Sequence, residues 1–314
     1  MFGFGRSAYH AADGATASKK SALTDDEERM ILRTGGAAAV VAGSIVEEEN
    51  SDGVEQTREE WQTELEQRIL TERNVYLTAS IRYHAEDDSG DCAVIANALA
   101  RSRSIRALWM DSNNIGEAGA LRIAEALRCN GTLQVLYLGY NNIGANGIGA
   151  LMEALRNNDT LLSLHLYHNN VSNIGAAKVG NALRGNRSLR ELDLSANEIG
   201  NSGMFKIADA LKANQCLQVL KLYKNNAGDA GAENLALALK ENESLQRLYL
   251  GSNSIGNDGA QKFIESIGRN GSLRSLDLYD NKVSQELQEK IKGLIAAPKM
   301  QPVWQRLLPE GHLL

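Results

Sequence analysis

Residues 133–143 read LQVLYLGYNNI, and 28 positions later residues 161–171 read LLSLHLYHNNV. Both stretches share the spacing LxxLxLxxN. The second and third leucines are two residues apart, so they point to one side of a short strand while the residue between them points to the other. We therefore expect the leucines to face inward. We expect the asparagine to end the strand at a turn, where its amide bonds unpaired backbone groups of adjacent turns.

The spacing extends far beyond these two stretches, because the asparagine returns seven times in succession with a period of 28 residues. The positions are Asn113, Asn141, Asn169, Asn197, Asn225, Asn253 and Asn281. A fixed period of this size indicates a repeat architecture. The second half of each unit carries apolar residues at helical spacing, as in Ala120, Ile123 and Leu127. Each unit is therefore predicted to be a strand, a turn, a helix and a turn.

Two further columns follow the predicted helices. One is asparagine, at Asn130, Asn158, Asn186, Asn214, Asn242 and Asn270. A left-handed C-terminal helix cap tolerates asparagine, and we expect that conformation here. The other is cationic, at Arg128, Arg156, Arg184, Lys212 and Lys240. Cations in the last helical turn complement the helix dipole, and a stripe that binds an acidic partner or phosphate is the alternative.

The pattern LxxLxLxxNxIG followed by GAxxIAxAL resembles the ribonuclease-inhibitor type of leucine-rich repeat. The resemblance covers residues 76–294 and implies an α/β fold, a curved horseshoe-shaped solenoid with a parallel sheet on the concave side and helices on the convex side. We expect this domain to span residues 76–297 with about eight repeats, its end units departing from the pattern to shield the core. At the N-terminal end, the 28-residue register puts Ser80, Arg82 and Ala85 at strand and asparagine positions.

Three segments flank the predicted repeats. Residues 1–53 are expected to be largely disordered and acidic, with a short helix near 25–33. Residues 54–75 carry Trp61, Leu65 and Ile69 at four-residue spacing, which predicts an amphipathic helix that caps the first repeat or docks to another chain. Residues 298–314 form an apolar tail that either packs over the last repeat or acts as a short interaction motif.

Composition excludes several classes of protein. The formal charge is -6, with fifteen acids and eight bases in residues 1–75, so a generally basic nucleic-acid binder is excluded. No apolar stretch approaches the roughly 20 residues of a membrane span. The three cysteines form no CxxC, which excludes a disulfide framework or cysteine zinc site and favours a reducing, cytoplasmic location. Organellar import through residues 1–24 is the alternative.

The outward strand positions are not fixed by the repeat, and they hold six of the nine tyrosines. Aromatic side chains anchor protein interfaces, since each buries a large rigid area and keeps a polar handle. Strand propensity is the alternative explanation. The candidate protein-binding residues are Trp109, Tyr137, Tyr140, His165, Tyr167, His168, Asp193, Lys221, Tyr223, Tyr249, Asp277 and Tyr279.

Catalytic chemistry is not favoured by these residues. His165, His168 and Asp193 suggest a metal or general-base cluster, but no second carboxylate, evident nucleophile or glycine-rich phosphate loop accompanies them. An Asp193–Lys221 surface ion pair is expected instead. We therefore predict no catalytic, metal or cofactor site, no small-molecule substrate, and a non-enzymatic intracellular scaffold for a protein partner. The resemblance to the leucine-rich repeat family leaves two alternative functions open. One is a GTPase-activating protein of the Ran-activator type, and the other is a regulatory, cytoskeletal or ciliary subunit.

Overall fold

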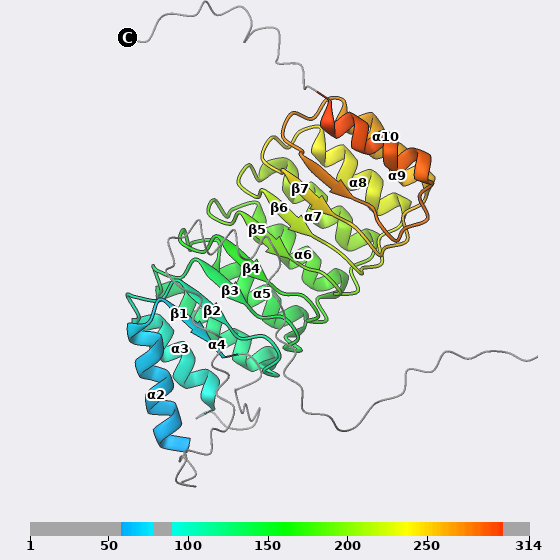
Figure 1. Ribbon diagram of the computed structural model, residues 1–314. Helices are drawn as coiled ribbons and strands as arrows, with labels where there is room; N and C mark the ends of the chain where they lie inside the picture. The colour runs from blue at the N-terminus through cyan, green and yellow to red at the C-terminus, as the bar shows by residue number, and fades with distance from the viewer. Residues whose placement is uncertain (1–57, 78–89, 298–314) are drawn as a thin grey trace, which may run out of the picture. The chain divides into compact units, whose positions relative to one another are not determined.

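The computed structural model describes residues 58–77 and 90–297, all within the compact unit Gly43–Leu314 (Figure 1). The expectations for residues 1–53 and for the tail 298–314 lie outside the described residues. So do Ser80, Arg82 and Ala85.

The described chain alternates strands of three residues with helices. The strands are β1 Asn74–Tyr76, β2 Ala107–Trp109, β3 Val135–Tyr137, β4 Ser163–His165, β5 Glu191–Asp193, β6 Val219–Lys221, β7 Arg247–Tyr249 and β8 Ser275–Asp277. The helices are α2 Arg58–Thr71, α3 Asp91–Arg101, α4 Gly116–Cys129, α5 Gly144–Ala154, α6 Ser172–Leu183, α7 Asn201–Ala213, α8 Asp229–Leu239, α9 Asn257–Ile267 and α10 Gln285–Ala296.

All eight strands form one parallel sheet in sequence order, and the helices cover one of its faces (Figure 1). The register follows the repeat, because Leu108 pairs with Leu136 and Leu136 with Leu164. These leucines are fully buried between sheet and helices. Packed helices need 8–10 Å each while strands lie about 4.8 Å apart, so the stack bends with the sheet on its inner side. The predicted α/β solenoid is confirmed.

The asparagines that follow the strands form the predicted buried ladder. Asn141 Nδ2 donates to the Met110 carbonyl at 2.7 Å, and its Oδ1 accepts from the backbone N–H of Asn113 at 2.8 Å. Asn169 repeats the arrangement one unit later, since its Nδ2 donates to the Leu138 carbonyl at 2.7 Å. Each amide therefore satisfies backbone groups that the short strands leave unpaired.

The second asparagine column is a ladder as well, and the expected left-handed cap is wrong. Asn130 has φ -80° and ψ 123°, an extended conformation. Its side chain explains the difference: Nδ2 donates to the Leu99 carbonyl at 2.7 Å, and Oδ1 accepts from the N–H of Leu133 at 2.7 Å. The Asn130 side chain thus links the end of helix α3 to the start of the following repeat, whereas a local cap would bond only its own helix.

The first repeat departs from the 28-residue register. Strand β1 pairs Asn74 with Ala107, so the first interval is 33 residues long instead of 28. Leu77 of the first unit corresponds to Met110 of the next unit. The Leu77 carbonyl accepts from Asn113 Nδ2 at 2.8 Å, as the Met110 carbonyl accepts from Asn141 Nδ2. Ahead of β1, helix α2 buries Leu65 and Ile69 completely in the core.

Two kinds of turn lead into the helices. Gly116, Gly144 and Ser172 have left-handed φ values of 64°, 70° and 55°, whereas Gly200, Gly228 and Gly256 are extended at -93°, -105° and -100°. The side chain 27 positions earlier explains the change. Asn173 Oδ1 accepts from the N–H of Gly200 at 2.8 Å and of Gly203 at 2.9 Å, which caps the next helix from outside. Where Glu117 or Ala145 holds that place, the following turn is left-handed.

Candidate functional site

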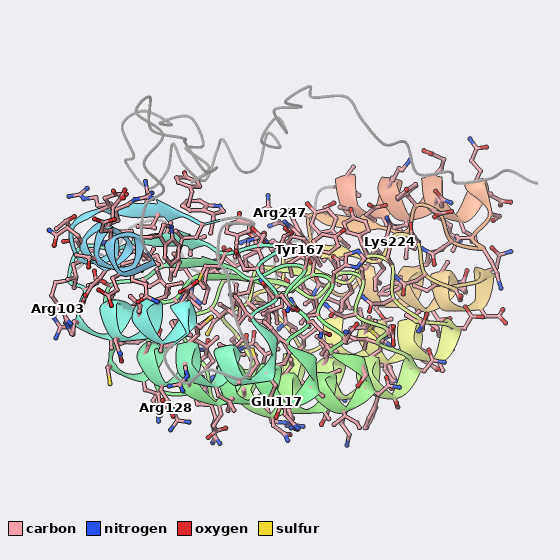
Figure 2. The ribbon with its side chains drawn as sticks, turned by 90° about the horizontal axis from the view of Figure 1, so that it is seen from below. Arg103, Glu117, Arg128, Tyr167, Lys224 and Arg247 are labelled. Carbon is pink, nitrogen blue, oxygen red and sulfur yellow. The ribbon has the colours of Figure 1, made fainter. Side chains whose placement is uncertain are left out.

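The sheet face is the side of the sheet that points away from the helices. It consists of the first and third residues of each strand and the first and second residues after the inward leucine that follows the strand. Figure 2 shows Tyr167, Lys224 and Arg247 on this side, and Glu117 and Arg128 on the side of the helices. All twelve candidate binding residues belong to the sheet face.

An aromatic row crosses the first four strands. Tyr76, Trp109, Tyr137 and His165 stack in order, with ring centroids 4.1, 5.6 and 3.9 Å apart. Parallel strands in register place these rings side by side, because each is the third residue of its strand. Burial raises the pKa of Tyr76. The sequence analysis missed Tyr76, since the 28-residue register put the first strand further along the chain.

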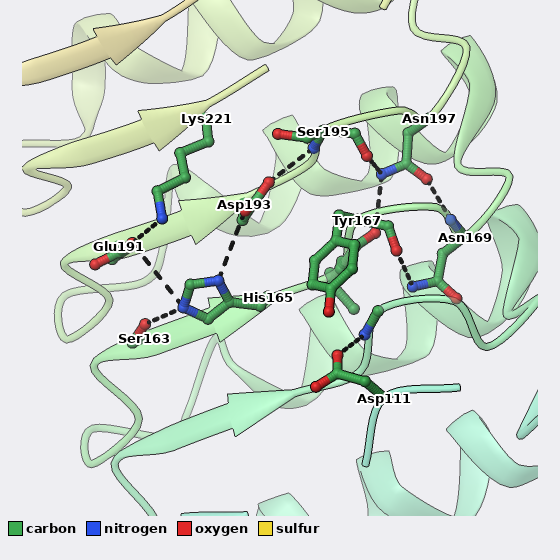
Figure 3. Close-up of polar contacts among 12 residues, drawn as sticks. Asp111, Ser163, His165, Tyr167, Asn169, Glu191, Asp193, Ser195, Asn197 and Lys221 are labelled. Carbon is green, nitrogen blue, oxygen red and sulfur yellow. Dashed lines mark hydrogen bonds and ion pairs between the residues drawn. The ribbon is translucent and has the colours of Figure 1, made fainter. Parts of the chain in front are cut away.

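A buried ionic cluster continues the row (Figure 3). His165 Nδ1 lies 3.6 Å from Asp193 Oδ2, and His165 Nε2 lies 2.9 Å from Ser163 Oγ. Glu191 Oε1 lies 3.9 Å from the same Nε2 and 2.9 Å from Lys221 Nζ. The expected Asp193–Lys221 pair is therefore corrected: the side chain that Lys221 contacts is Glu191, which is on the same strand as Asp193 and two residues before it.

The charges in this cluster stabilise one another. Burial by itself would raise the pKa of Asp193, but the hydrogen bond and charge of His165, together with Lys221, hold that pKa below its usual value. Burial would likewise lower the pKa of Lys221, and the carboxylates of Glu191 and Asp193 outweigh it, so the pKa is raised. Both groups are thus held in their charged forms.

Ser163, His165 and Asp193 stand in the order of a serine–histidine–aspartate relay, but their surroundings oppose catalysis. Ser163 is 2% exposed, so a substrate carbonyl has no access to its hydroxyl. The Glu191 carboxylate lies beside the same histidine nitrogen, where its negative charge would oppose a developing oxyanion. Among the described residues, no group of three or more His, Cys, Asp or Glu side chains has the arrangement of a metal site.

Tyr167 crosses the neighbouring strand above a glycine. A Cβ on Gly139 would collide with the Tyr167 ring, so only glycine lets the ring lie against this backbone. The phenol points toward Asp111, which follows β2 (Figure 3), and Asp111 Oδ1 accepts from the Gly139 N–H at 2.7 Å. Burial, followed by the charge of Asp111, raises the pKa of Tyr167. Burial also raises the pKa of Asp111.

The same arrangement recurs near the other end of the sheet. A Cβ on Gly251 would lie 2.7 Å from Tyr223 Cε1 and 2.8 Å from Tyr279 Cδ1, so the two rings flank this glycine. Tyr223 donates its phenol to Asp277 Oδ2 at 2.6 Å, and Asp277 Oδ1 accepts from the Tyr279 N–H at 2.9 Å. Burial and the Asp277 bond raise the pKa of Tyr223. Its ring also lies 5.5 Å from that of Tyr249.

The sheet face is less exposed than its outward direction suggests. Tyr137, His165 and Asp193 are buried, whereas Tyr140 and Tyr279 are 53% and 61% exposed. Tyr140 stacks on the exposed His168 ring at 4.2 Å and meets the Tyr167 ring edge-on at 5.4 Å. The surface open to a partner is therefore the rim where the strands end, and the middle of the face is an internal polar network.

Several members of this network were not among the sequence candidates. They are Tyr76, Asp111, Gly139, Ser163, Glu191 and Gly251. The first strand residue is an outward position just as the third is, and this signal would have identified Ser163 and Glu191. The glycines have no side chain to attract notice, and their importance comes from the rings that neighbouring repeats place on them.

The convex cations are mostly paired. Arg156 pairs with Glu153, Arg184 with Asp209 and Lys212 with Glu241. Within the described parts of the chain, no helix has both the length and the apolar character that crossing a bilayer requires.

The family model described as Leucine Rich repeat matches residues 129–152, 185–208, 213–236 and 241–263. No curated protein sequence matches the chain significantly. Among solved structures, leiomodin-1 actin-binding site 2 is similar at 18% identity and a TM-score of 0.42, over 46% of this chain and 85% of that one. The C-terminal domain of Caenorhabditis elegans tropomodulin is similar at 14% identity and a TM-score of 0.41, over 48% and 90%.

Proposed function

The chain is a leucine-rich repeat protein, and from this premise we propose that it is a non-enzymatic scaffold that binds a protein partner through its sheet face. The observation that carries the proposal is the aromatic rim. Tyr140 and Tyr279 are exposed, and the half-buried rings of Tyr167 and Tyr223 lie between them. Tyr223 donates a hydrogen bond to Asp277, and the Tyr167 phenol points toward Asp111.

The dimensions of the rim suit a protein interface. Tyr140 follows β3 and Tyr279 follows β8, so five strand spacings of about 4.8 Å separate them by about 24 Å. A standard interface buries about 800 Å² on each partner, a patch about 30 Å across. The rim therefore spans one partner footprint.

Preorganisation favours binding at the rim. An interface loses affinity when it must freeze mobile side chains, and tyrosine has few rotatable bonds. Tyr167 and Tyr223 are further restrained because each ring lies against a glycine, and Tyr223 also donates a hydrogen bond to Asp277. The rim can thus bury aromatic area with little additional ordering.

Site-specific photo-crosslinking tests the proposal. p-Benzoylphenylalanine is placed at Tyr140 or Tyr279 of the full chain, which is irradiated in native extract. The matched control places it at Ile174 or Phe205, which are 67% and 45% exposed on α6 and α7. We expect one protein to be crosslinked from both sheet-face positions and from neither helix-face position. Crosslinks from Ile174 and Phe205 alone would place the partner on the helices and refute the assignment.

A further inference from the structure

Asp111 is a buried carboxylate of the sheet face that has no counter-ion among the described residues. Asp111 is 8% exposed, it accepts a hydrogen bond from the Gly139 N–H, and the Tyr167 phenol points toward it. No ion pair to Asp111 occurs among residues 58–77 and 90–297. His165 attracts Asp111 at longer range, but its ring nitrogens are engaged by Ser163 and Asp193.

A carboxylate in this position favours an incoming cation. Burial removes water from the charged form, which raises the pKa of Asp111, and a buried charge is disfavoured until an opposite charge pairs with it. A neutral backbone donor and a neighbouring phenol only partly replace the lost solvation. The remaining acceptor capacity of the carboxylate, beside the Tyr167 ring, suits a guanidinium or ammonium group, which both carboxylates and aromatic faces attract.

The second aspartate has a related environment. Asp277 is half-buried, and it accepts from the Tyr223 phenol and the Tyr279 N–H. Beside it, Tyr279 and Asp280 are exposed. The described part of the chain places no cation within ion-pair distance of Asp277. The two aspartates lie on or next to β2 and β8, so about 29 Å of sheet separates them.

The sheet face as a whole is acidic. Its carboxylates are Asp111, Glu191, Asp193, Asp277 and Asp280, and its cations are Lys221, Lys224 and Arg247. Lys221 is paired with Glu191. A partner with cationic side chains is therefore complementary to this face, and an acidic partner is not.

We propose that Asp111 with Tyr167, and Asp277 with Tyr223, are two subsites that each bind an arginine or lysine side chain of the partner polypeptide. Gly139 and Gly251 are the positioning residues, because they let each ring reach its aspartate across an intervening strand. This inference rests on the proposed function and names the chemistry of the partner.

A defined peptide tests the subsites without the natural partner. Acetyl-hexaarginine amide is titrated into the full chain by isothermal calorimetry at low and at physiological ionic strength, with acetyl-hexaglutamate amide as the opposite charge. The variant is Asp111→Asn with Asp277→Asn, since asparagine still accepts the hydrogen bonds. The control is Asp159→Asn with Asp258→Asn, which removes the same charge from two exposed positions.

We expect hexaarginine to bind the wild-type chain and hexaglutamate not to bind. The sheet-face double variant should weaken hexaarginine binding at least tenfold, the control less than twofold, and Asp277→Asn alone by an intermediate factor. Equal losses in both double variants would show attraction to overall charge and overturn the subsites, as would no hexaarginine binding. If the subsites are wrong, the photo-crosslinks from Tyr140 and Tyr279 can still form. If the proposed function is wrong, those crosslinks are missing, so the two failures are distinguished.

Discussion

Replacing Asn197 with alanine tests the central ladder. Asn197 is fully buried, and its side chain makes four hydrogen bonds to backbone groups. Its Nδ2 donates to the carbonyls of Leu166 at 2.8 Å and Ser195 at 3.0 Å. Its Oδ1 accepts from the N–H groups of Asn169 at 2.8 Å and Val171 at 3.3 Å.

The magnitude follows from the groups that alanine leaves unsatisfied. The Leu166 carbonyl and the Asn169 N–H have no other hydrogen-bond partner among the described residues. Each buried unsatisfied group costs about 1–3 kcal/mol, so Asn197→Ala should lower the free energy of unfolding by about 2–6 kcal/mol. With an m-value of about 1–3 kcal/mol per molar urea, the midpoint should fall by about 0.7 M or more.

Equilibrium urea unfolding followed by circular dichroism measures the change. The control is Asn226→Ala, the same substitution at an exposed position between β6 and α8 whose φ is not positive. We expect the control to stay within about 0.5 kcal/mol of the wild type, as surface substitutions usually do. If Asn197→Ala unfolds at the same urea concentration as Asn226→Ala, the ladder does not support the stack and the reasoning fails.

Three further predictions concern the sheet face. The pKa of Asp193 is lowered in the folded state, so Asp193→Asn should destabilise the fold at pH 7. Urea unfolding measures the free energy of unfolding of both proteins, and their difference should vanish as the pH falls well below 3.8. The pKa of Asp111 is raised in the folded state, so ionisation of this carboxyl opposes folding as the pH rises above 3.8. Asp111→Asn should therefore be at least as stable as the wild type at pH 7. A clearly lower free energy of unfolding in the variant would contradict the raised pKa. Gly139→Ala should displace the Tyr167 ring and lower the pKa of its phenol toward 10. The phenol is followed by its alkaline absorbance transition, which is identified because the Tyr167→Phe variant lacks it. A transition that Gly139→Ala leaves unchanged would show that the ring does not lie on the glycine.

The regular part of the fold could be predicted because one period fixes it. A strand leucine such as Leu136 and a ladder residue such as Asn141 return at the same spacing, and parallel pairing in register follows directly. The first strand could not be placed this way. Its interval to β2 is 33 residues, and a periodic pattern contains no information about where extra residues enter.

The turns and the second ladder depend on contacts between units. Asn130 resembles a local helix cap in the sequence. Its side-chain amide, however, hydrogen-bonds the end of the preceding helix α3 at Leu99 and the segment before β3 at Leu133. Gly144 and Gly200 look alike in the sequence, yet one is left-handed and the other extended, because Asn173 caps the helix after Gly200. Such differences appear only when two repeats are read together.

The candidate site was predicted in its position but not in its internal structure. Alternation along the strand was enough to place Tyr167 and Tyr223 on the outward face. It could not show that their phenols reach toward aspartates two strands away, Asp111 for one and Asp277 for the other. The burial of His165 likewise depends on what surrounds it across the sheet, which strand alternation does not encode.

Binding of the crosslinked partner to two double variants tests the central claim most directly. Tyr140→Ala with Tyr279→Ala removes the exposed anchors of the sheet face, and Ile174→Ala with Phe205→Ala removes large exposed side chains of the helix face. Truncated interface anchors cost about 2 kcal/mol or more, so the sheet-face variant should raise the dissociation constant by about 30-fold or more, measured by calorimetry. The helix-face variant should leave it within threefold. The reverse outcome, with affinity lost only in the Ile174 and Phe205 variant, would contradict the account.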